Sequence, residues 1–182
     1  MANNIEVEME QTVCMWKGNT KRRFYNYLLV KSDILHKLKG EISDLGKIEN
    51  LAEKIDTLTE GCLYVGKGQG DRALDHLFKA ANGDNIDIKS STIKDVWESG
   101  NGIVVYKGFH NSTSHEASTR EAVIIDFFST EKMTNIRKGS YYGNVGGWAR
   151  EKLHNMGLHY VVKMLIDLML HRQMVFLESD IM

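Results

Sequence analysis

The chain has 182 residues, of which 42% are hydrophobic, and this is enough apolar material for the core of one domain. Its net charge is -1, so the overall positive charge of many nucleic-acid-binding proteins is absent and any such surface must be a local patch. Two cysteines are too few for a disulfide framework, and residues 1–13 lack the apolar stretch of a signal peptide. We therefore expect an intracellular protein of the nucleus or cytoplasm, without membrane association.

The first 23 residues are expected to form an N-terminal extension, and a basic patch begins within them. Between Lys17 and Lys31 the sequence has five basic residues and no acidic one. A solvated loop and an arm that contacts phosphate both fit this pattern. Arg22 and Arg23 are the residues of this patch that we expect to contact nucleic acid.

Strand and helix signals follow the extension. The short aromatic and apolar segment Phe24–Val30 predicts a first strand. Apolar residues in steps of three and four over Ile34–Leu58 predict a helical insert at residues 31–61, which its glycines divide in two. Acidic residues outnumber lysines over Glu41–Glu60, so this insert is expected to pack away from phosphate.

Predicted strands and helices continue to alternate in the next segments. Cys62–Val65 predicts a second strand, and Asp71 is a favourable N-cap for a helix that runs to about Ala81. Gly102–Phe109 predicts a third strand, and Thr113–Phe128 predicts a helix.

The last part of the chain, residues 144–182, is expected to be a helical extension with a break near Gly157. Its apolar positions leave two alternatives, packing on the chain's own core or contact with a second copy in a homodimer. These positions are Leu158, Val161, Val162, Leu165, Leu168 and Met169.

The predicted helix Thr113–Phe128 carries a carboxylate on its apolar side. At 100° per residue, Glu121 falls on the same stripe as Ala117 and Ile124. A buried carboxylate needs a cation, a hydrogen-bond donor or a metal, so Glu121 is either part of a structural ion pair or a functional ligand. Glu116 is expected to be structural, because Thr113 and Glu116 have the spacing of a capping box.

Arg72 and His76 lie one turn apart at the start of another predicted helix, next to the glycine-rich segment Gly66–Gly70. The helix dipole disfavours a cation in the first turn, unless an anion shares the site. Helix N-termini also attract phosphate. This arrangement favours a phosphodiester site, although the glycine spacing matches neither the Walker nor the dinucleotide pattern.

Taken in order, these residues resemble the motifs of the GIY-YIG endonuclease family over about residues 24–143. Tyr27 resembles the tyrosine of the first motif, although the sequence there is Tyr25-Asn26-Tyr27, and Tyr64-Val65-Gly66 resembles the second motif. Within this family, the chain resembles the nuclease subgroup of ankyrin-repeat and LEM-domain proteins. The positions that match the family's later residues are Arg72, His76, Glu121 and Asn135.

The resemblance implies an α+β fold, in which a small three-stranded antiparallel sheet is flanked by helices. It implies a metal-dependent endonuclease that hydrolyses DNA, with branched DNA as one candidate substrate. Glu121 would bind Mg²⁺ or Mn²⁺ together with several waters, because such hard cations keep much of their hydration. A catalytically silent DNA-binding or scaffolding module of the same fold is the alternative.

The resemblance also implies roles for the other residues. Tyr27 or Tyr64 would act as the general base, and Lys67 and Arg72 are the cations that would favour the phenolate. Arg72 would stabilise charge in the transition state, and His76 would share the site. Asn135 would orient the site or serve as a turn residue. The expected DNA surface consists of Arg22, Arg23, Lys67, Arg137 and Lys138.

Overall fold

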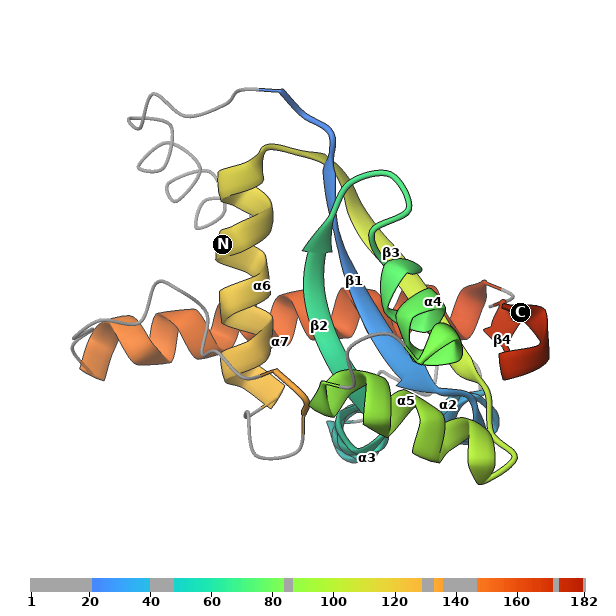
Figure 1. Ribbon diagram of the computed structural model, residues 1–182. Helices are drawn as coiled ribbons and strands as arrows, with labels where there is room; N and C mark the ends of the chain where they lie inside the picture. The colour runs from blue at the N-terminus through green and yellow to red at the C-terminus, as the bar shows by residue number, and fades with distance from the viewer. Residues whose placement is uncertain are drawn as a thin grey trace.

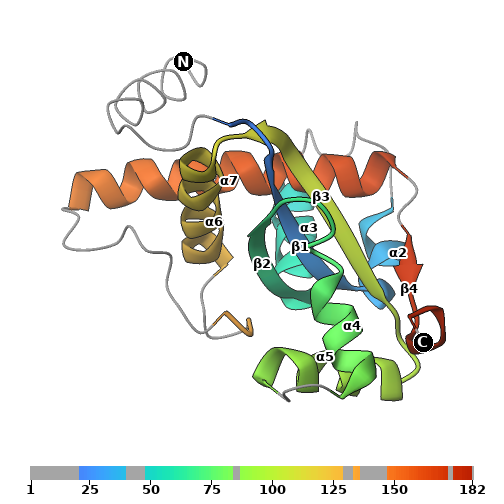
Figure 2. The ribbon, with the colours of Figure 1, turned by 45° about the horizontal axis from the view of Figure 1, so that its top comes forward.

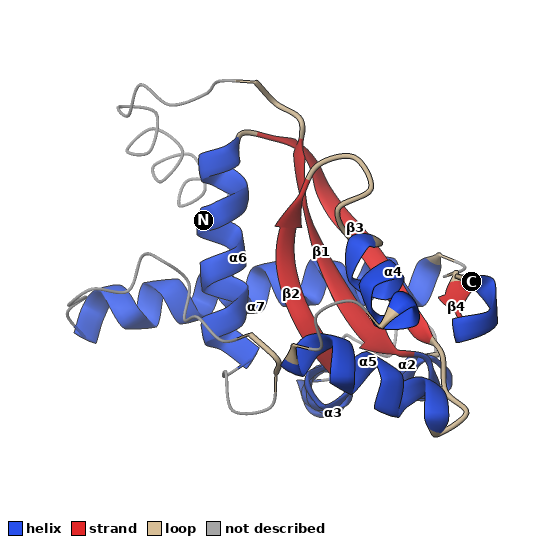
Figure 3. Cartoon of the chain, viewed as in Figure 1, coloured by secondary structure: helices blue, strands red, loops and turns tan. Residues whose placement is uncertain are grey.

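The computed structural model describes residues 21–39, 48–83, 87–128, 133–135, 147–171 and 174–181 (Figure 1). These residues form an antiparallel sheet with helices packed against it, which confirms the expected α+β class (Figure 3). The spatial order of the strands is β2-β1-β3-β4, and the fourth strand adds to the three that the sequence predicts. The strands are β1 (Phe24–Lys31), β2 (Cys62–Gly68), β3 (Ile103–Ser112) and β4 (Val175–Phe176).

Strand β1 lies between β2 and β3, and helices cover both of its faces. Tyr27 and Leu29 belong to one hydrophobic cluster, and Leu28 and Val30 belong to the other. This division follows from the two-residue period of a strand. Asn26 is also fully buried, and its side chain donates a hydrogen bond of 2.8 Å to the carbonyl of Ala117. The central strand therefore connects two separate cores.

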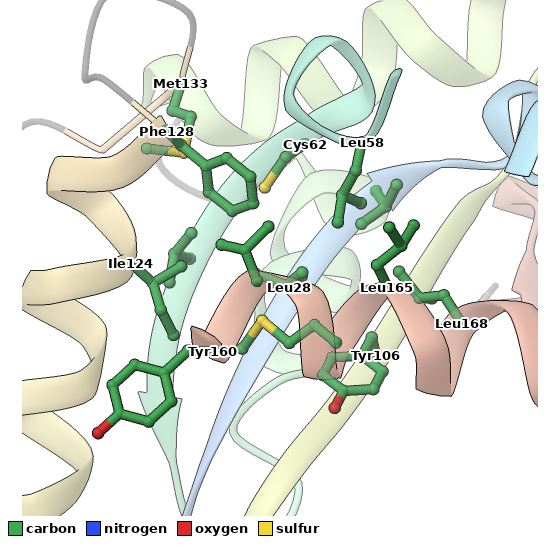
Figure 4. Packing of buried hydrophobic residues seen from close by; sticks show 14 of the residues in the cluster. Leu28, Leu58, Cys62, Tyr106, Ile124, Phe128, Met133, Tyr160, Leu165 and Leu168 are labelled. Atoms are coloured by element: carbon green, nitrogen blue, oxygen red, sulfur yellow. The ribbon is translucent and has the colours of Figure 1, made fainter. Parts of the chain in front are cut away.

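The two faces of the sheet carry different helices (Figure 2). Helices α4 (Asp75–Asn82) and α5 (Ile88–Glu98) contribute to the cluster that contains Tyr27. The opposite cluster, shown in Figure 4, contains Leu28 and residues from four other helices. Those helices are α2 (Leu35–Leu38), α3 (Ile48–Gly61), α6 (Ser114–Phe128) and α7 (Gly147–Leu170), and two short 3-10 helices cover Ser32–Ile34 and Glu178–Asp180.

The insert between the first two strands is helical, as the apolar spacing predicts. It forms α2 and α3, whereas residues 40–47, with the two glycines expected to divide it, lie outside the described residues. Leu58 of α3 is fully buried in the cluster opposite Tyr27. The acidic side chains of Glu53, Asp56 and Glu60 are exposed on this helix.

The helix after β2 begins at Asp75 and not at Asp71, which corrects the predicted boundary. Residues 71–74 form a turn instead, with the amide of Leu74 bonded to the carbonyl of Asp71 at 2.8 Å. The hydroxyl of Tyr25 fixes this turn, because it donates to Gly70 and accepts from the amide of Ala73. A side chain from β1 thus holds the turn in a conformation that local spacing does not reveal.

Helix α5 has no counterpart among the predicted elements. Its N-terminus is capped by Asp87, whose carboxylate accepts a 2.7 Å hydrogen bond from the amide of Ser90. Ile93 and Trp97 are buried, but Ile88 at the helix start is 63% exposed. The apolar residues therefore do not give a regular helical stripe, and tertiary packing determines this helix.

Helix α7 passes through Gly157 without the expected break. A Cβ at Gly157 would lie 2.8 Å from the Cβ of Phe127, so the glycine allows α6 and α7 to approach closely. Val161 and Leu165 are fully buried in the chain's own core, which is one of the two expected alternatives. In the parts of the chain that the structure describes, no helix combines the length and apolar character needed to cross a membrane.

The final segment departs from the helical extension that the sequence predicts. Val175 and Phe176 form β4 and pair with Val104 and Ile103 of β3. The indole N–H of Trp97 also donates to the carbonyl of Phe176 at 3.1 Å. A strand forms here because β3 offers unpaired backbone groups and α5 offers a donor.

Replacing Gly157 with leucine is expected to destabilise the protein by about 1–3 kcal/mol, because the new side chain overlaps Phe127 in a packed helix contact. Equilibrium urea unfolding measures this change. Glu151→Ala on the exposed side of the same helix is the control and should alter stability by less than about 0.5 kcal/mol. Equal stability of the two variants would show that α6 and α7 do not pack this closely.

Candidate active site

Three aromatic side chains from different elements meet on one face of the sheet. Tyr27 comes from β1, Tyr64 from β2 and His76 from α4, and their ring centroids lie 5.1–6.0 Å apart. The hydroxyl oxygen of Tyr27 lies 2.7 Å from Nε2 of His76. The cross-strand neighbour of Tyr27 is Gly66, where any Cβ would overlap the tyrosine ring. The glycine of the second motif is therefore required by packing.

Both tyrosines are neutral in the resting site. Burial is the largest effect and raises the pKa of Tyr27 far above its ordinary value, and the neighbouring Tyr64 raises it further. Burial followed by the negative charge of Glu121 raises the pKa of Tyr64. The Arg72 guanidinium lowers the pKa of both tyrosines. A phenolate at either position thus needs additional positive charge.

His76 is only 7% exposed and is neutral at physiological pH. Burial lowers the pKa of its imidazole to about 4, and the positive charges of Lys89, Arg72 and Lys79 act in the same direction. A neutral imidazole carries one ring N–H and one lone pair. Its two ring nitrogens therefore play different roles in the site.

Glu121 approaches the aromatic cluster from α6, which contacts both β1 and β2. Its carboxyl group is half-buried, as the position on the apolar stripe indicates. Burial raises the pKa of this carboxyl, whereas the ammonium group and the backbone N–H of Lys67 lower it. Among the described residues there is no group of three or more potential metal-binding side chains. Glu121 is thus a single carboxylate beside the tyrosines.

Two cations border this cluster in different ways. The ammonium group of Lys67 donates to the hydroxyls of Ser114 and Ser118, at 3.1 and 2.8 Å, and so connects β2 to α6. The side chain of Arg72 is 53% exposed and forms an ion pair of 3.2 Å with Asp75. Lys67 is therefore held in place by the protein, whereas Arg72 lies at the rim, where a phosphate group can approach.

Asn135 holds the strand that carries the second motif. Its side chain accepts a hydrogen bond from the amide of Val65 at 3.0 Å and donates to the carbonyl of the same residue at 2.8 Å. Thr134 also bonds to the carbonyl of Leu63 through its amide and its hydroxyl. These two residues satisfy backbone groups along the outer edge of β2, which is an edge strand.

Glu116 has the capping geometry that its spacing predicts. Its carboxylate accepts from the amide of Thr113, and the Thr113 hydroxyl accepts from the amide of Glu116 at 3.2 Å. Arg22, an expected DNA contact, pairs with this carboxylate at 3.0 Å. Arg23 is exposed near the ring of Phe24.

Lys17, Arg137 and Lys138 lie outside the described residues.

Lys89 belongs to the site but has no counterpart among the residues that the sequence suggests. Its ammonium nitrogen lies 3.7 Å from the ring centre of Tyr64 and 3.5 Å from Nδ1 of His76. Apolar spacing does not indicate this residue, because α5 lacks a regular apolar stripe. The helix-capping pair Asp87 and Ser90 is the local signal from which this helix start can be recognised.

Replacing Asn135 with alanine is expected to destabilise the protein by about 2 kcal/mol or more, since both backbone groups of Val65 lose a buried partner. Chemical denaturation measures the loss. Asn101→Ala is the matched control, because it removes an exposed hydrogen bond from the Asn101 side chain to Ser99 and should cost much less stability. A stable Asn135→Ala protein with reduced catalysis would instead assign the asparagine to the chemical step.

The buried His76 is expected to make stability depend on pH. The pKa of His76 in the folded state, about 4, lies below the ordinary value of 6.5, so protons bind more strongly to the unfolded chain between these limits. The contribution of neutral His76 to the free energy of unfolding is therefore intact above pH 6.5 and is lost as the pH falls toward 4. Between pH 7 and 5 the wild-type protein should lose about 2 kcal/mol more than His76→Gln.

Urea unfolding of both proteins at the two pH values measures this difference, and the other histidines cancel in the comparison. Equal losses in the two proteins would mean that His76 titrates normally in the folded state.

Comparison with known proteins agrees with this geometry. The family model described as a LEM-3-like GIY-YIG domain matches residues 24–182. Ankyrin repeat and LEM domain-containing protein 1 of Mus musculus is 30% identical over 156 residues, which cover 83% of this chain and 28% of the mouse protein. The protein of the same name from Homo sapiens is 28% identical over 159 residues, covering 83% and 25%. The Caenorhabditis elegans homologue is 32% identical over 108 residues, covering 56% and 15%.

The chain thus spans about a quarter of the length of the two mammalian relatives. No solved structure matches it. The family match supports a nuclease and includes both tyrosine motifs, the residues of α4 and Glu121. This chain therefore belongs to the LEM-3-like GIY-YIG domain family.

Proposed function

We propose that the chain is a metal-dependent endonuclease that hydrolyses phosphodiester bonds in DNA. The observation that carries this proposal is the convergence of two tyrosines and a histidine on one face of the sheet, with Tyr27 and His76 2.7 Å apart. Glu121 lies close enough to this cluster to raise the pKa of Tyr64. A potential base, a carboxylate and an exposed cation, Arg72, thus border one site.

The carboxylate of Glu121 fits a hard divalent cation such as Mg²⁺ or Mn²⁺. It is half-buried and its pKa is raised mainly by burial, so a bound cation would relieve the cost of its charge. A single protein carboxylate suits Mg²⁺, which keeps several waters. When bound, the cation would supply positive charge to the phosphate and to the leaving oxygen.

The chain's own residues would carry out the remaining steps. With added positive charge in the site, one tyrosine of the Tyr27–Tyr64 pair would first lose its hydroxyl proton to solvent. The resulting phenolate would then accept a proton from water as the water oxygen bonds to phosphorus and the phosphorus–oxygen ester bond breaks. The leaving oxygen then takes a proton from solvent. Arg72 would stabilise the negative charge of the transition state; its guanidinium is exposed at the rim and lowers the pKa of both tyrosines, which supports this role.

The distribution of charge favours a DNA path over the Tyr27 face. Arg23 is exposed near one end of β1, and Arg72 lies at the rim of the tyrosine cluster. Helix α3, with its exposed acidic residues, packs against the opposite core. Arg137 and Lys138 remain part of the proposed surface, whereas Arg22 is engaged by Glu116. Plasmid, branched and single-stranded DNA are the substrates to compare.

Replacing Glu121 with glutamine is expected to reduce the single-turnover cleavage rate by about 100-fold or more, because the neutral amide binds a divalent cation poorly. Cleavage is measured with Mg²⁺ and with Mn²⁺ on the three kinds of DNA. Glu116→Gln on the same helix is the control, which should cost only about 1 kcal/mol of stability and leave the rate largely intact.

Two results would contradict the proposal. Cleavage by Glu121→Gln at the wild-type rate would remove this residue from the site. A wild-type protein that binds DNA but cuts none of the substrates with either metal would instead be a silent binding module.

A further inference from the structure

Lys89 is a half-buried cation beside the aromatic cluster, and none of the family motifs found in the sequence includes it. It lies in the first turn of α5, where the helix dipole disfavours a positive charge. Burial is the largest effect on its pKa and lowers it to about 8, and Arg72 and Lys79 lower it too. Asp87 and Glu121 oppose this shift, so the amine is mainly charged at neutral pH. Because this position disfavours a cation, we ask which neighbouring group the ammonium of Lys89 contacts.

The geometry of that neighbour, His76, is asymmetric. Its Nε2 lies 2.7 Å from the Tyr27 hydroxyl, and its Nδ1 lies 3.5 Å from the ammonium nitrogen of Lys89. An ammonium group has only donors, and a neutral imidazole has one N–H and one lone pair. An N–H at Nδ1 would therefore point one donor at another beside a full positive charge. The arrangement favours a lone pair at Nδ1 and the proton at Nε2.

We propose that Lys89 is a positioning residue that holds His76 as the Nε2–H tautomer, so that His76 donates a hydrogen bond to the oxygen of Tyr27. In the opposite tautomer, Nε2 would accept the proton of Tyr27, and the histidine would serve as a proton acceptor. Lys89 thus determines whether His76 donates a hydrogen bond to the Tyr27 oxygen, which stabilises negative charge there, or accepts one from the Tyr27 hydroxyl. This inference rests on the proposed nuclease function only for its catalytic consequence.

The consequence concerns the tyrosine pair. With its oxygen accepting from His76, Tyr27 must direct its own hydroxyl proton elsewhere. Burial and Glu121 raise the pKa of Tyr64, and the interaction with the Tyr27 hydroxyl opposes this rise. The ammonium of Lys89 lies over the ring of Tyr64 as well. One cation therefore acts on both tyrosines, on Tyr27 through His76 and on Tyr64 through its ring.

The tautomer is measured directly by long-range ¹H–¹⁵N correlation NMR of the full chain without DNA or metal. The wild-type protein is expected to show His76 protonated at Nε2, and Lys89→Met should move the proton toward Nδ1. Lys89→Arg should keep the wild-type tautomer because it keeps a donor cation. Lys79→Met is the control: Lys79 is an exposed cation that also lowers the pKa of His76. Thermal unfolding verifies that each variant folds.

The catalytic consequence is measured separately, as single-turnover cleavage at saturating DNA beside the dissociation constant. Lys89→Met should lose about tenfold or more in rate with less than about threefold change in affinity. Lys89→Arg should recover part of the rate, and Lys79→Met should retain it.

An Nδ1–H tautomer in the wild type, or an unchanged tautomer in Lys89→Met, overturns the inference. Loss of affinity without loss of rate would make Lys89 a phosphate contact and overturn its catalytic role. If the wild type cuts no DNA, the nuclease proposal fails, but the NMR result still decides the tautomer.

Discussion

The buried hydrogen bond between Tyr27 and His76 is the interaction around which the site is organised. Both polar atoms lie in a hydrophobic cluster, where either one alone would cost the desolvation of an unpaired group. The bond therefore specifies how α4 sits on β1. It also brings the Tyr27 ring across Gly66 of the neighbouring strand, which leaves no space for a side chain there. One pairing thus explains a tyrosine, a glycine and a histidine that belong to three separate motifs.

Hydrogen bonds on either side of this pairing hold the surrounding elements in place. Tyr25 fixes the turn before α4 by bonding to Gly70 and Ala73. Asn135 satisfies both backbone groups of Val65 at the outer edge of β2, and Lys67 connects β2 to the serines of α6. Elements that carry Tyr64 and Glu121 are therefore tied to each other through side chains. Such support is what a catalytic arrangement needs to keep its geometry.

The electrostatics of the site depend on separation of charge within a nearly neutral chain. Lys89 and Arg72 surround a neutral His76 on one face of the sheet. Exposed acidic residues of α3 lie on a helix that packs against the other core. Low net charge is thus compatible with a local positive field that attracts phosphate. Burial strengthens this effect, because a cation near the low-dielectric cluster is poorly screened by water.

The sequence by itself determined the features that depend on local spacing. The three main strands, the helix Ser114–Phe128, the stripe that carries Glu121 and the capping role of Glu116 follow from residues close together in the chain. The order of the motifs was also enough to indicate the family. These features are readable because periodicity and capping are local properties.

Only the tertiary structure decided the features that depend on distant residues. The strand β4 forms because β3 has backbone groups to pair with, and α7 continues through Gly157 because α6 packs against it. The turn before α4 depends on a tyrosine about 45 positions away along the chain. The position of Lys89 beside His76 depends on the packing of α5 against α4, whereas the local capping pair indicates only where α5 begins. Where local sequence leaves several conformations nearly equal in energy, contacts between distant segments stabilise one of them.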